Sequence, residues 1–288
     1  MMMNPRGRLA ASAMLRPNDK QRVLDHYNRA SPYYRALWGE HLHHGYWIRG
    51  DESKEIAQLQ LVEHLARAAG IGPRARLLDI GCGFGASSIY LSHKYEAQAV
   101  GITISPPQVE MAKQAARQAG ATVTFLCMDA ESMHFDEPFD FLWSIESISH
   151  YQDVPRFFSN AARLLKPGGS FALTDWFKQK SLPPREHRKF LRPIEEGMLV
   201  ELNTMLDYET WLAAVGLDVR HREVLNRYTA QTWDLGLDII KDRALWQLAA
   251  RHGPEFLRFL RAFKAMRAGF ASGQFIYGLM VANRPGPA

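Results

Sequence analysis

A glycine-rich turn between a short apolar run and an amphipathic stretch constrains the fold most. Residues 77–86 read LLDIGCGFGA, so Gly81, Gly83 and Gly85 follow an apolar run that ends at Ile80. Residues without a Cβ let a ligand lie against the backbone, and a helix that starts here offers unpaired N–H groups to an anion. The segment therefore predicts a strand, a turn and a helix that hold a nucleotide-like cofactor. A tight turn that binds no ligand is the alternative.

Apolar runs alternate with helical patterns from residue 75 to residue 177. We expect strands over RLLDIG, QAVGITI, VTFLCM, FDFLWSI and SFALTDW, and helices over 86–94, 107–119 and 154–165. Strands separated by helices of about ten to fifteen residues imply right-handed crossovers and a doubly wound, mostly parallel sheet. This stretch is the expected cofactor-binding core.

The flanking segments divide the chain further. Pro32 is expected to break or restart the first helix of the N-terminal region, because proline has no N–H to continue a helix. The apolar run near the C-terminus, QFIYGLMVANRP, is expected to be a last strand of the sheet. The predicted parts are a disordered tail (1–17), a helical lead-in and cofactor cover (18–74), the core (75–177), a mostly helical substrate lid with a sheet strand near 217–224 (178–272), and a final strand and tail (273–288).

Composition excludes several classes of protein. No apolar run approaches the roughly 20 residues that span a bilayer, so we expect no integral membrane segment. The net charge of +5 is scattered along the chain, which argues against nucleic acid as a partner. Cys82 and Cys127 are too few for a disulfide framework, which fits a reducing compartment, and we expect a cytoplasmic protein. The expected partner is a small-molecule substrate, and a homo-oligomer stays open.

One basic stretch leaves a membrane contact open. Arg258, Arg261, Lys264 and Arg267 share one side of the helix expected over 255–267. A solvated face is the first interpretation, and a weak peripheral contact with an anionic membrane is the alternative.

Two observations separate the cofactors that such a loop could hold. Gly81, Gly83 and Ala86 also satisfy the dinucleotide fingerprint G-x-G-x-x-G/A, but a nicotinamide cofactor expects an acidic ribose ligand about 20 residues further on. Residues 101–105 read GITIS and offer none. Asp79, two residues before the first glycine, would repel a pyrophosphate and attract an ammonium group. A cationic amino-acid cofactor fits better than NAD.

Four motifs in this order resemble those of class I S-adenosylmethionine-dependent methyltransferases. They are D-x-G-x-G-x-G at 79–85, MDA at 128–130, FDF at 139–141 and LKPGG at 165–169. The resemblance implies S-adenosylmethionine as cofactor and a Rossmann-like, doubly wound, mostly parallel seven-stranded sheet with N-terminal helices and an inserted helical lid. It also implies that Asp79 and the three glycines hold the methionine end, and that Asp129 and the Ala130 N–H read the adenine.

One segment departs from the usual family pattern. The family places an acidic residue near Thr103 to hold the ribose, whereas this chain has Thr103, Ile104 and Ser105, followed by Gln108. The segment resembles the I-S-x-x-Q pattern of tocopherol-type, sugar O-methylating and cyclopropane-forming enzymes. Hydroxyl and amide groups can hydrogen-bond a ribose, so these four residues are predicted cofactor contacts.

Residues 38–47, WGEHLHHGYW, resemble a segment of tocopherol methyltransferases and of bacterial sugar O-methyltransferases. The resemblance implies a cover over the cofactor mouth, and we expect Tyr27, His43, Tyr46 and Trp176 to form it. Simple packing is the alternative. Three histidines within four residues suggest a metal site, but no Cys or carboxylate cluster completes one, so we expect no metal.

The fourth predicted strand ends in WSIESISHY, residues 143–151. A histidine at this edge can accept the proton that methyl transfer releases, so His150 is the expected general base, and a buried structural histidine is the alternative. The segment resembles an E-x-x-x-H pattern of tocopherol-type relatives, which favours the functional interpretation of His150. Glu146 is expected to brace the cofactor entrance or to stabilise a carbocation, the role that its counterpart has in the similar enzymes that methylate prenyl chains. Asp175 is expected to orient His150 or to bind a substrate hydroxyl, with a turn carboxylate as the alternative.

Aromatic and Met residues in the lid favour an apolar pocket wall. The predicted reaction is methyl transfer to a carbon or oxygen of a small lipophilic natural product, with prenylated aromatics, quinones or terpenoids first. Methylation of the sugar of a glycosylated natural product is the second hypothesis. A nicotinamide oxidoreductase and a catalytically silent cofactor-binding module are the alternatives from other classes.

Overall fold

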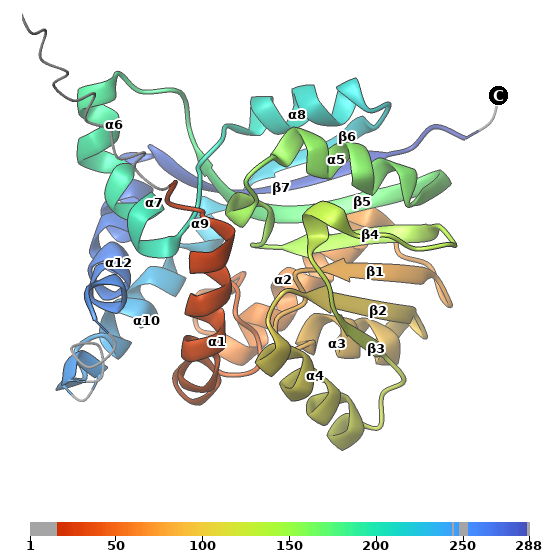
Figure 1. Ribbon diagram of the computed structural model, residues 1–288, viewed down its shortest axis with the longest axis horizontal. Coiled ribbons are helices and arrows are strands. Elements are labelled where there is room, and N and C mark those ends of the chain that lie inside the picture. Colours follow the sequence, from red (N-terminus) through yellow and green to blue (C-terminus); the bar gives the residue numbers. More distant parts are fainter. Residues whose placement is uncertain (1–15, 244, 248–252, 287–288) are drawn as a thin grey trace, which may run out of the picture.

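A seven-stranded sheet lies at the centre of the computed structural model, which describes residues 16–243, 245–247 and 253–286. The strand order is β3-β2-β1-β4-β5-β7-β6, and Figure 1 shows it from the bottom of the view to the top. Strands β1 to β5 run parallel, and β7 is antiparallel to both β5 and β6. The predicted fold class is confirmed. The strands are β1 (Arg76–Ile80), β2 (Gln98–Thr103), β3 (Thr124–Cys127), β4 (Phe139–Ile145), β5 (Leu165–Lys178), β6 (Asp218–Val224) and β7 (Phe275–Asn283).

Side chains alternate between the two faces of the sheet, as the strand period of two requires. Leu77 packs with the helices of one face, and its neighbour Leu78 packs with those of the other. The first face carries α2 and α3, and α4 lies beside them against β3. The second face carries α5 and α8. These helices are α2 (Lys54–Ala69), α3 (Ala86–Tyr95), α4 (Pro106–Ala119), α5 (Val154–Arg163) and α8 (Met205–Ala214).

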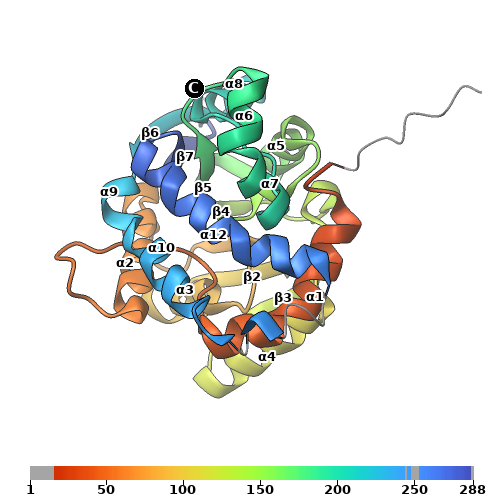
Figure 2. The same ribbon diagram turned by 90° about the vertical axis from the view of Figure 1, so that its left-hand side faces the viewer.

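The remaining helices gather beyond the carboxyl ends of the parallel strands. Figure 1 shows α1, α7, α10 and α12 together at that end, and Figure 2 shows α12 crossing in front of it. Short 3-10 helices follow β3 and β4 at the same edge. The elements are α1 (Lys20–Leu37), α6 (Pro184–Phe190), α7 (Arg192–Met198), α9 (Asn226–Thr229), α10 (Gln231–Ile239), α12 (Pro254–Ser272), η1 (Ala130–Ser132) and η2 (Ile148–His150).

Part of the segment expected as a lid packs elsewhere. Tyr208 and Leu212 of α8 are buried against the aromatic residues of α5 and β5, so α8 belongs to the layer that covers the sheet. The cover over the strand ends is therefore built by α1, α6, α7, α10 and α12.

The first helix is continuous, which corrects the expectation for Pro32. α1 runs from Lys20 to Leu37 with Pro32 inside it. Proline removes one helical hydrogen bond, but the buried residues Val23, Ala30 and Ser31 pack along one side of α1 and outweigh this local loss.

The expected tail, 1–17, lies almost wholly outside the described residues. Its last part is described, and the Arg16 guanidinium donates a hydrogen bond to the Gln152 carbonyl at 3.1 Å. None of the helices that the structure describes is long and apolar enough to cross a membrane.

Candidate active site

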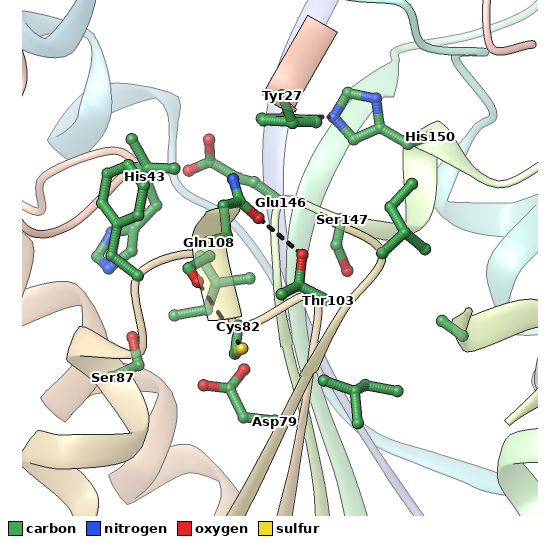
Figure 3. A pocket seen from close by; sticks show the side chains of 18 of the residues that line it. Tyr27, His43, Asp79, Cys82, Ser87, Thr103, Gln108, Glu146, Ser147 and His150 are labelled. Atoms are coloured by element: carbon green, nitrogen blue, oxygen red, sulfur yellow. Dashed lines mark hydrogen bonds between the residues drawn. The ribbon is translucent and has the colours of Figure 1, made fainter. Parts of the chain in front are cut away.

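A cavity lies where β1, β2 and β4 end, beneath α1. We call it the first cavity, and Figure 3 shows 18 of its lining side chains and labels ten of them. The structure brings together most of the predicted site residues here: Tyr27, His43, Asp79, Gly81, Gly83, Thr103, Ile104, Gln108, Asp129, Ala130, Glu146, His150 and Trp176 line it. Tyr46, Gly85, Ser105 and Asp175 do not.

A Cβ is excluded at Gly81 and at Gly85 by different neighbouring residues. Gly81 has a φ of +80°, and a Cβ there would lie 2.4 Å from the Ser147 Cβ, so only glycine fits at the cavity wall. A Cβ on Gly85 would lie 2.4 Å from the ring of Phe125. Gly85 therefore lets α3 approach the sheet and does not contact the cavity.

Asp79 presents a buried carboxyl group to the first cavity. Ser88 donates a hydrogen bond to its Oδ2 at 2.6 Å. Burial nevertheless raises the pKa of Asp79 to about 7, since no cation among the described residues faces the carboxylate. A cationic ligand group placed here would restore its ionised form.

The segment after β2 holds itself by side-chain hydrogen bonds. The Thr103 hydroxyl donates to Gln108 Oε1 at 2.7 Å, and both side chains line the first cavity. Ser105 is fully buried and donates to Asn28 Oδ1 of α1 at 2.8 Å. Ser105 therefore ties α1 to this segment and does not reach the cavity.

Lys20 closes the other side of the first cavity. Its ammonium lies 2.7 Å from Asp129 Oδ2 and 2.8 Å from Glu131 Oε2. The predicted adenine-reading residue thus also anchors the first turn of α1.

His150 forms a hydrogen-bonded pair with Tyr27. Its Nδ1 lies 2.9 Å from the Leu199 carbonyl, which can only accept, so Nδ1 carries the proton. Nε2 then accepts from the Tyr27 hydroxyl at 2.9 Å, as Figure 3 shows. Burial lowers the pKa of His150, which keeps the imidazole neutral with its lone pair on Nε2.

Glu146 lies at a strained backbone position with a φ of +52°. Its Oε1 accepts from the backbone N–H of His44 at 2.7 Å, from His44 Nδ1 at 2.9 Å and from the Tyr277 hydroxyl at 2.7 Å. Although burial opposes ionisation, the contacts with His44 hold the pKa of Glu146 below its usual range. A fixed carboxylate therefore faces the cavity.

Asp175 makes no direct contact with His150 and does not line the first cavity. The carboxylate is fully buried and accepts hydrogen bonds from the Ser149 N–H and hydroxyl, the Trp176 N–H and the Tyr208 hydroxyl. The side chain of His150 contacts Tyr27 and Leu199 instead. Asp175 therefore fixes the backbone of η2, which contains His150, against β5.

The structure places only some of the predicted cover residues at the first cavity. His43 and Trp176 line the first cavity, whereas Tyr46 stacks on His64 with ring centroids 4.5 Å apart and lies outside it. His44, one residue from His43, makes the contact with Glu146. His41 and His43 bond each other at 2.9 Å, and no group of His, Cys, Asp or Glu in the described part of the chain could hold a metal ion.

A second cavity adjoins the first beneath the helical cover. Six residues line both: Tyr27, Leu42, His43, Glu146, His150 and Trp176. Aromatic and aliphatic side chains from α1, α10 and α12 form most of its remaining wall. Among the residues that the structure describes, its lining contains no Lys or Arg.

Comparison with known proteins identifies the class of enzyme. A family model described as "Methyltransferase domain" matches residues 78–173. The 27-O-demethylrifamycin SV methyltransferase of Amycolatopsis mediterranei (strain S699) is 33% identical over 244 residues, which cover 82% of this chain and 89% of that protein. The chain belongs to the class I S-adenosylmethionine-dependent methyltransferases. The predicted enzyme class and cofactor are confirmed, and the nicotinamide alternative is set aside.

Other relatives place this methyltransferase in the small-molecule subgroup. A probable chloroplastic tocopherol O-methyltransferase of Oryza sativa subsp. japonica is 28% identical over 290 residues, covering 93% of this chain and 79% of that protein. The solved structure of the [4+2]-cyclase SpnF superimposes with a TM-score of 0.81 at 25% identity and covers 93% of this chain and 96% of that one.

The side chains and backbone that line the first cavity are chemically suited to S-adenosylmethionine. A buried carboxyl at Asp79 suits an ammonium group, and the close backbone approach at Gly81 suits a ligand that lies against the loop.

The sequence analysis did not predict the residues that hold the predicted site residues in position. His44 stood in a recognised motif, but Lys20, Ser88, Leu199 and Tyr277 gave no local signal, since only the fold brings them to the site.

Proposed function

We propose that this methyltransferase methylates a carbon or oxygen of a small lipophilic natural product, such as a prenylated aromatic, a quinone or a terpenoid. The observation that carries the proposal is the apolar second cavity, which shares six lining residues with the first. An apolar cavity beside a cofactor site takes an apolar acceptor. The names of the tocopherol and rifamycin relatives support a natural-product substrate.

The residues of the first cavity would hold the cofactor in the proposed assignment. Asp79 faces the ammonium of the methionine end, with Gly81 and Gly83 against the ligand. Thr103 and Gln108 hydrogen-bond the ribose, and Asp129 with the Ala130 N–H reads the adenine. When bound, S-adenosylmethionine supplies a sulfonium methyl group, which passes to the nucleophile as its bond to sulfur breaks.

The Tyr27–His150 pair supplies the proton acceptor. Both residues line both cavities, so the Tyr27 oxygen can meet a substrate hydroxyl. As the hydroxyl attacks the methyl carbon, its proton passes to the Tyr27 oxygen, and the proton of Tyr27 passes to His150 Nε2. With a carbon nucleophile, the Glu146 carboxylate stabilises the positive charge until a proton of the substrate passes to the Tyr27 oxygen and the proton of Tyr27 passes to His150 Nε2. The cover excludes water and holds the reactants in near-attack geometry.

A substrate panel tests this function. The purified enzyme is incubated with S-adenosylmethionine and prenylated phenols, quinols, terpenoid alcohols or glycosylated natural products, and S-adenosylhomocysteine formation is followed. NMR of the product then distinguishes a C-methyl from an O-methyl group. Turnover confined to the lipophilic acceptors is expected. Turnover of the glycosylated compounds alone, at the sugar, would contradict the proposal.

A further inference from the structure

The middle of α1 carries a second polar pair that the methyl-transfer step does not use. His26 Nε2 lies 2.8 Å from the Tyr34 hydroxyl, and both side chains line the second cavity. The rings of His26 and Tyr34 pack against Phe259 with centroids 5.3 and 5.6 Å apart. Two hydrogen-bonding side chains therefore stand in a mostly apolar wall.

The mutual hydrogen bond leaves each partner with unused capacity. A neutral imidazole has one donor and one acceptor nitrogen, and a phenol both donates and accepts. Among the residues that the structure describes, the side chains of His26 and Tyr34 make no other hydrogen bond. Whichever tautomer His26 adopts, its Nδ1 and the second bonding site of the Tyr34 hydroxyl stay available. Polar groups in apolar surroundings are normally satisfied, which points to a ligand atom.

The pair is uncharged at neutral pH. Burial, reinforced by the nearby His150, lowers the pKa of His26 to about 3. A neutral imidazole beside a phenol suits a hydroxyl or carbonyl oxygen better than an anion, which would favour a charged partner.

The His26–Tyr34 pair lies close to the Tyr27–His150 pair but is separate from it. The ring of Tyr27 lies 5.4 Å from that of His26 and 5.5 Å from that of His150, measured between centroids. His26 and Tyr34 therefore lie one ring beyond the Tyr27–His150 pair along the wall that α1 forms. A ligand oxygen bound there belongs to a part of the substrate remote from the methylated atom.

We propose that His26 and Tyr34 form a specificity site that binds a hydroxyl or carbonyl oxygen on the remote part of the substrate. The inference rests on the proposed function and narrows its substrate class to uncharged, oxygen-bearing lipophiles. A plain hydrocarbon tail would leave the pair unsatisfied, and sites built to hydrogen-bond an oxygen discriminate against analogues that lack it.

A matched pair of ligands tests the site without turnover. 8-Hydroxygeraniol and geraniol share one alcohol, which the Tyr27–His150 pair can bind, and they differ by one hydroxyl group at the other end of the chain. Each is titrated into enzyme loaded with S-adenosylhomocysteine, and binding is followed by the fluorescence of Trp38, Trp176 and Trp233, which line the second cavity. Wild-type enzyme should bind 8-hydroxygeraniol about three- to tenfold more tightly than geraniol, as one neutral hydrogen bond implies.

The variants locate the oxygen. Tyr34→Phe and His26→Leu should bring the affinity ratio close to one, and His26→Gln, which keeps a donor and an acceptor, should restore part of it. Tyr90→Phe removes a hydroxyl from a side chain of α3 that lines neither cavity, and it should keep the wild-type ratio. Unchanged affinity for S-adenosylhomocysteine shows that each variant is folded.

Three results would overturn the inference: equal binding of the two ligands by wild type, a ratio that survives both Tyr34→Phe and His26→Leu, or no binding of either ligand. Failure of the proposed function is distinguishable, because it is read from the methylation panel. An enzyme that methylates lipophilic acceptors but shows no preference for 8-hydroxygeraniol refutes the specificity site alone. One that prefers 8-hydroxygeraniol through this pair but methylates only sugars refutes the proposed function alone.

Discussion

At the scale of single residues, the hydrogen bonds of His150 determine which nitrogen can accept a proton. Nδ1–H is committed to the Leu199 carbonyl, so only Nε2 is basic. Because the pKa of His150 is lowered, the imidazole is already neutral at pH 7, and kcat/KM should rise with pH to a plateau with a midpoint below 6.5. His150→Asn should lower kcat by about a hundredfold or more, and the rise of kcat/KM with pH should disappear.

The control for this prediction is Tyr27→Phe. Without the phenol, Nε2 can still accept a proton directly, so a smaller loss is expected and the rise of kcat/KM with pH should remain. A His150→Asn enzyme with the wild-type rate and pH dependence would show that His150 is a structural residue.

Asp79 links cofactor binding to the stability of the free protein. Its pKa in the folded chain is raised to about 7, above the unfolded value near 3.9, so ionisation costs stability as the pH rises between these values. Asp79→Asn removes this cost. At pH 8 the cofactor-free variant should be more stable than wild type, by on the order of 1 to 4 kcal/mol, with little difference at pH 4.

The same change should weaken S-adenosylmethionine binding at least tenfold, since the ammonium loses its partner. Thermal unfolding across pH and calorimetric titration measure the two effects. Asp136→Asn, on an almost fully exposed carboxylate, is the matched control and should alter neither. A cofactor-free Asp79→Asn protein that is less stable than wild type at pH 8 would contradict the argument.

The sequence predicted the site residues that belong to a motif, but not the positions of side chains that depend on tertiary packing. Asp79 lies near the end of β1, and Glu146 and His150 follow β4, so strand direction places them at the cavity. Tyr46 was expected in the cover because it shares a motif with His43, but its ring stacks on His64 away from the cavity. Which side chains of an irregular segment face a site depends on partners far along the chain, and periodicity carries no information about them.

At the scale of elements, the alternation of apolar runs and helical patterns predicted β1 to β5, and β6 and β7 were predicted from separate segments outside it. The helices over the strand ends were harder, because α8 and the cover helices have similar apolar patterns and differ only in what they pack against. Pro32 is the opposite case. A strong local signal for a break was overridden by the contacts along α1.

α1 covers both cavities, and its first turn is tied down by Lys20. The ammonium bridges Asp129 and Glu131, one of which is the predicted adenine contact. Lys20→Ala should let this end of α1 open more often and raise the dissociation rate of S-adenosylhomocysteine by about two- to fivefold, the range of a partly exposed ion pair. Stopped-flow fluorescence measures the rate.

The matched control is Lys113→Ala, which removes the exposed ion pair with Glu110 on α4. This variant should release S-adenosylhomocysteine at the wild-type rate. Equal rates for the Lys20→Ala enzyme and wild type would show that the ion pair does not hold α1 over the cofactor.

At the scale of the whole molecule, the two cavities impose a charge selection on the acceptor. The Glu146 carboxylate lines both of them, and the described lining of the second cavity offers no Lys or Arg to neutralise a phosphate. An anionic acceptor would meet a like charge where water is excluded, which costs free energy at low dielectric. The molecule should therefore accept prenyl alcohols and reject prenyl diphosphates.

Geranyl diphosphate should bind at least tenfold more weakly than geraniol to enzyme loaded with S-adenosylhomocysteine. Added Mg²⁺ should not close the gap, because no cluster of carboxylates or histidines in the described part of the chain could hold the ion. Glu146→Gln removes the charge at nearly constant size and should narrow the difference, whereas Glu110→Gln on the surface of α4 should leave it unchanged. If the diphosphate binds as tightly as the alcohol, the charge of Glu146 does not select the acceptor, and the substrate class must be sought among phosphorylated isoprenoids.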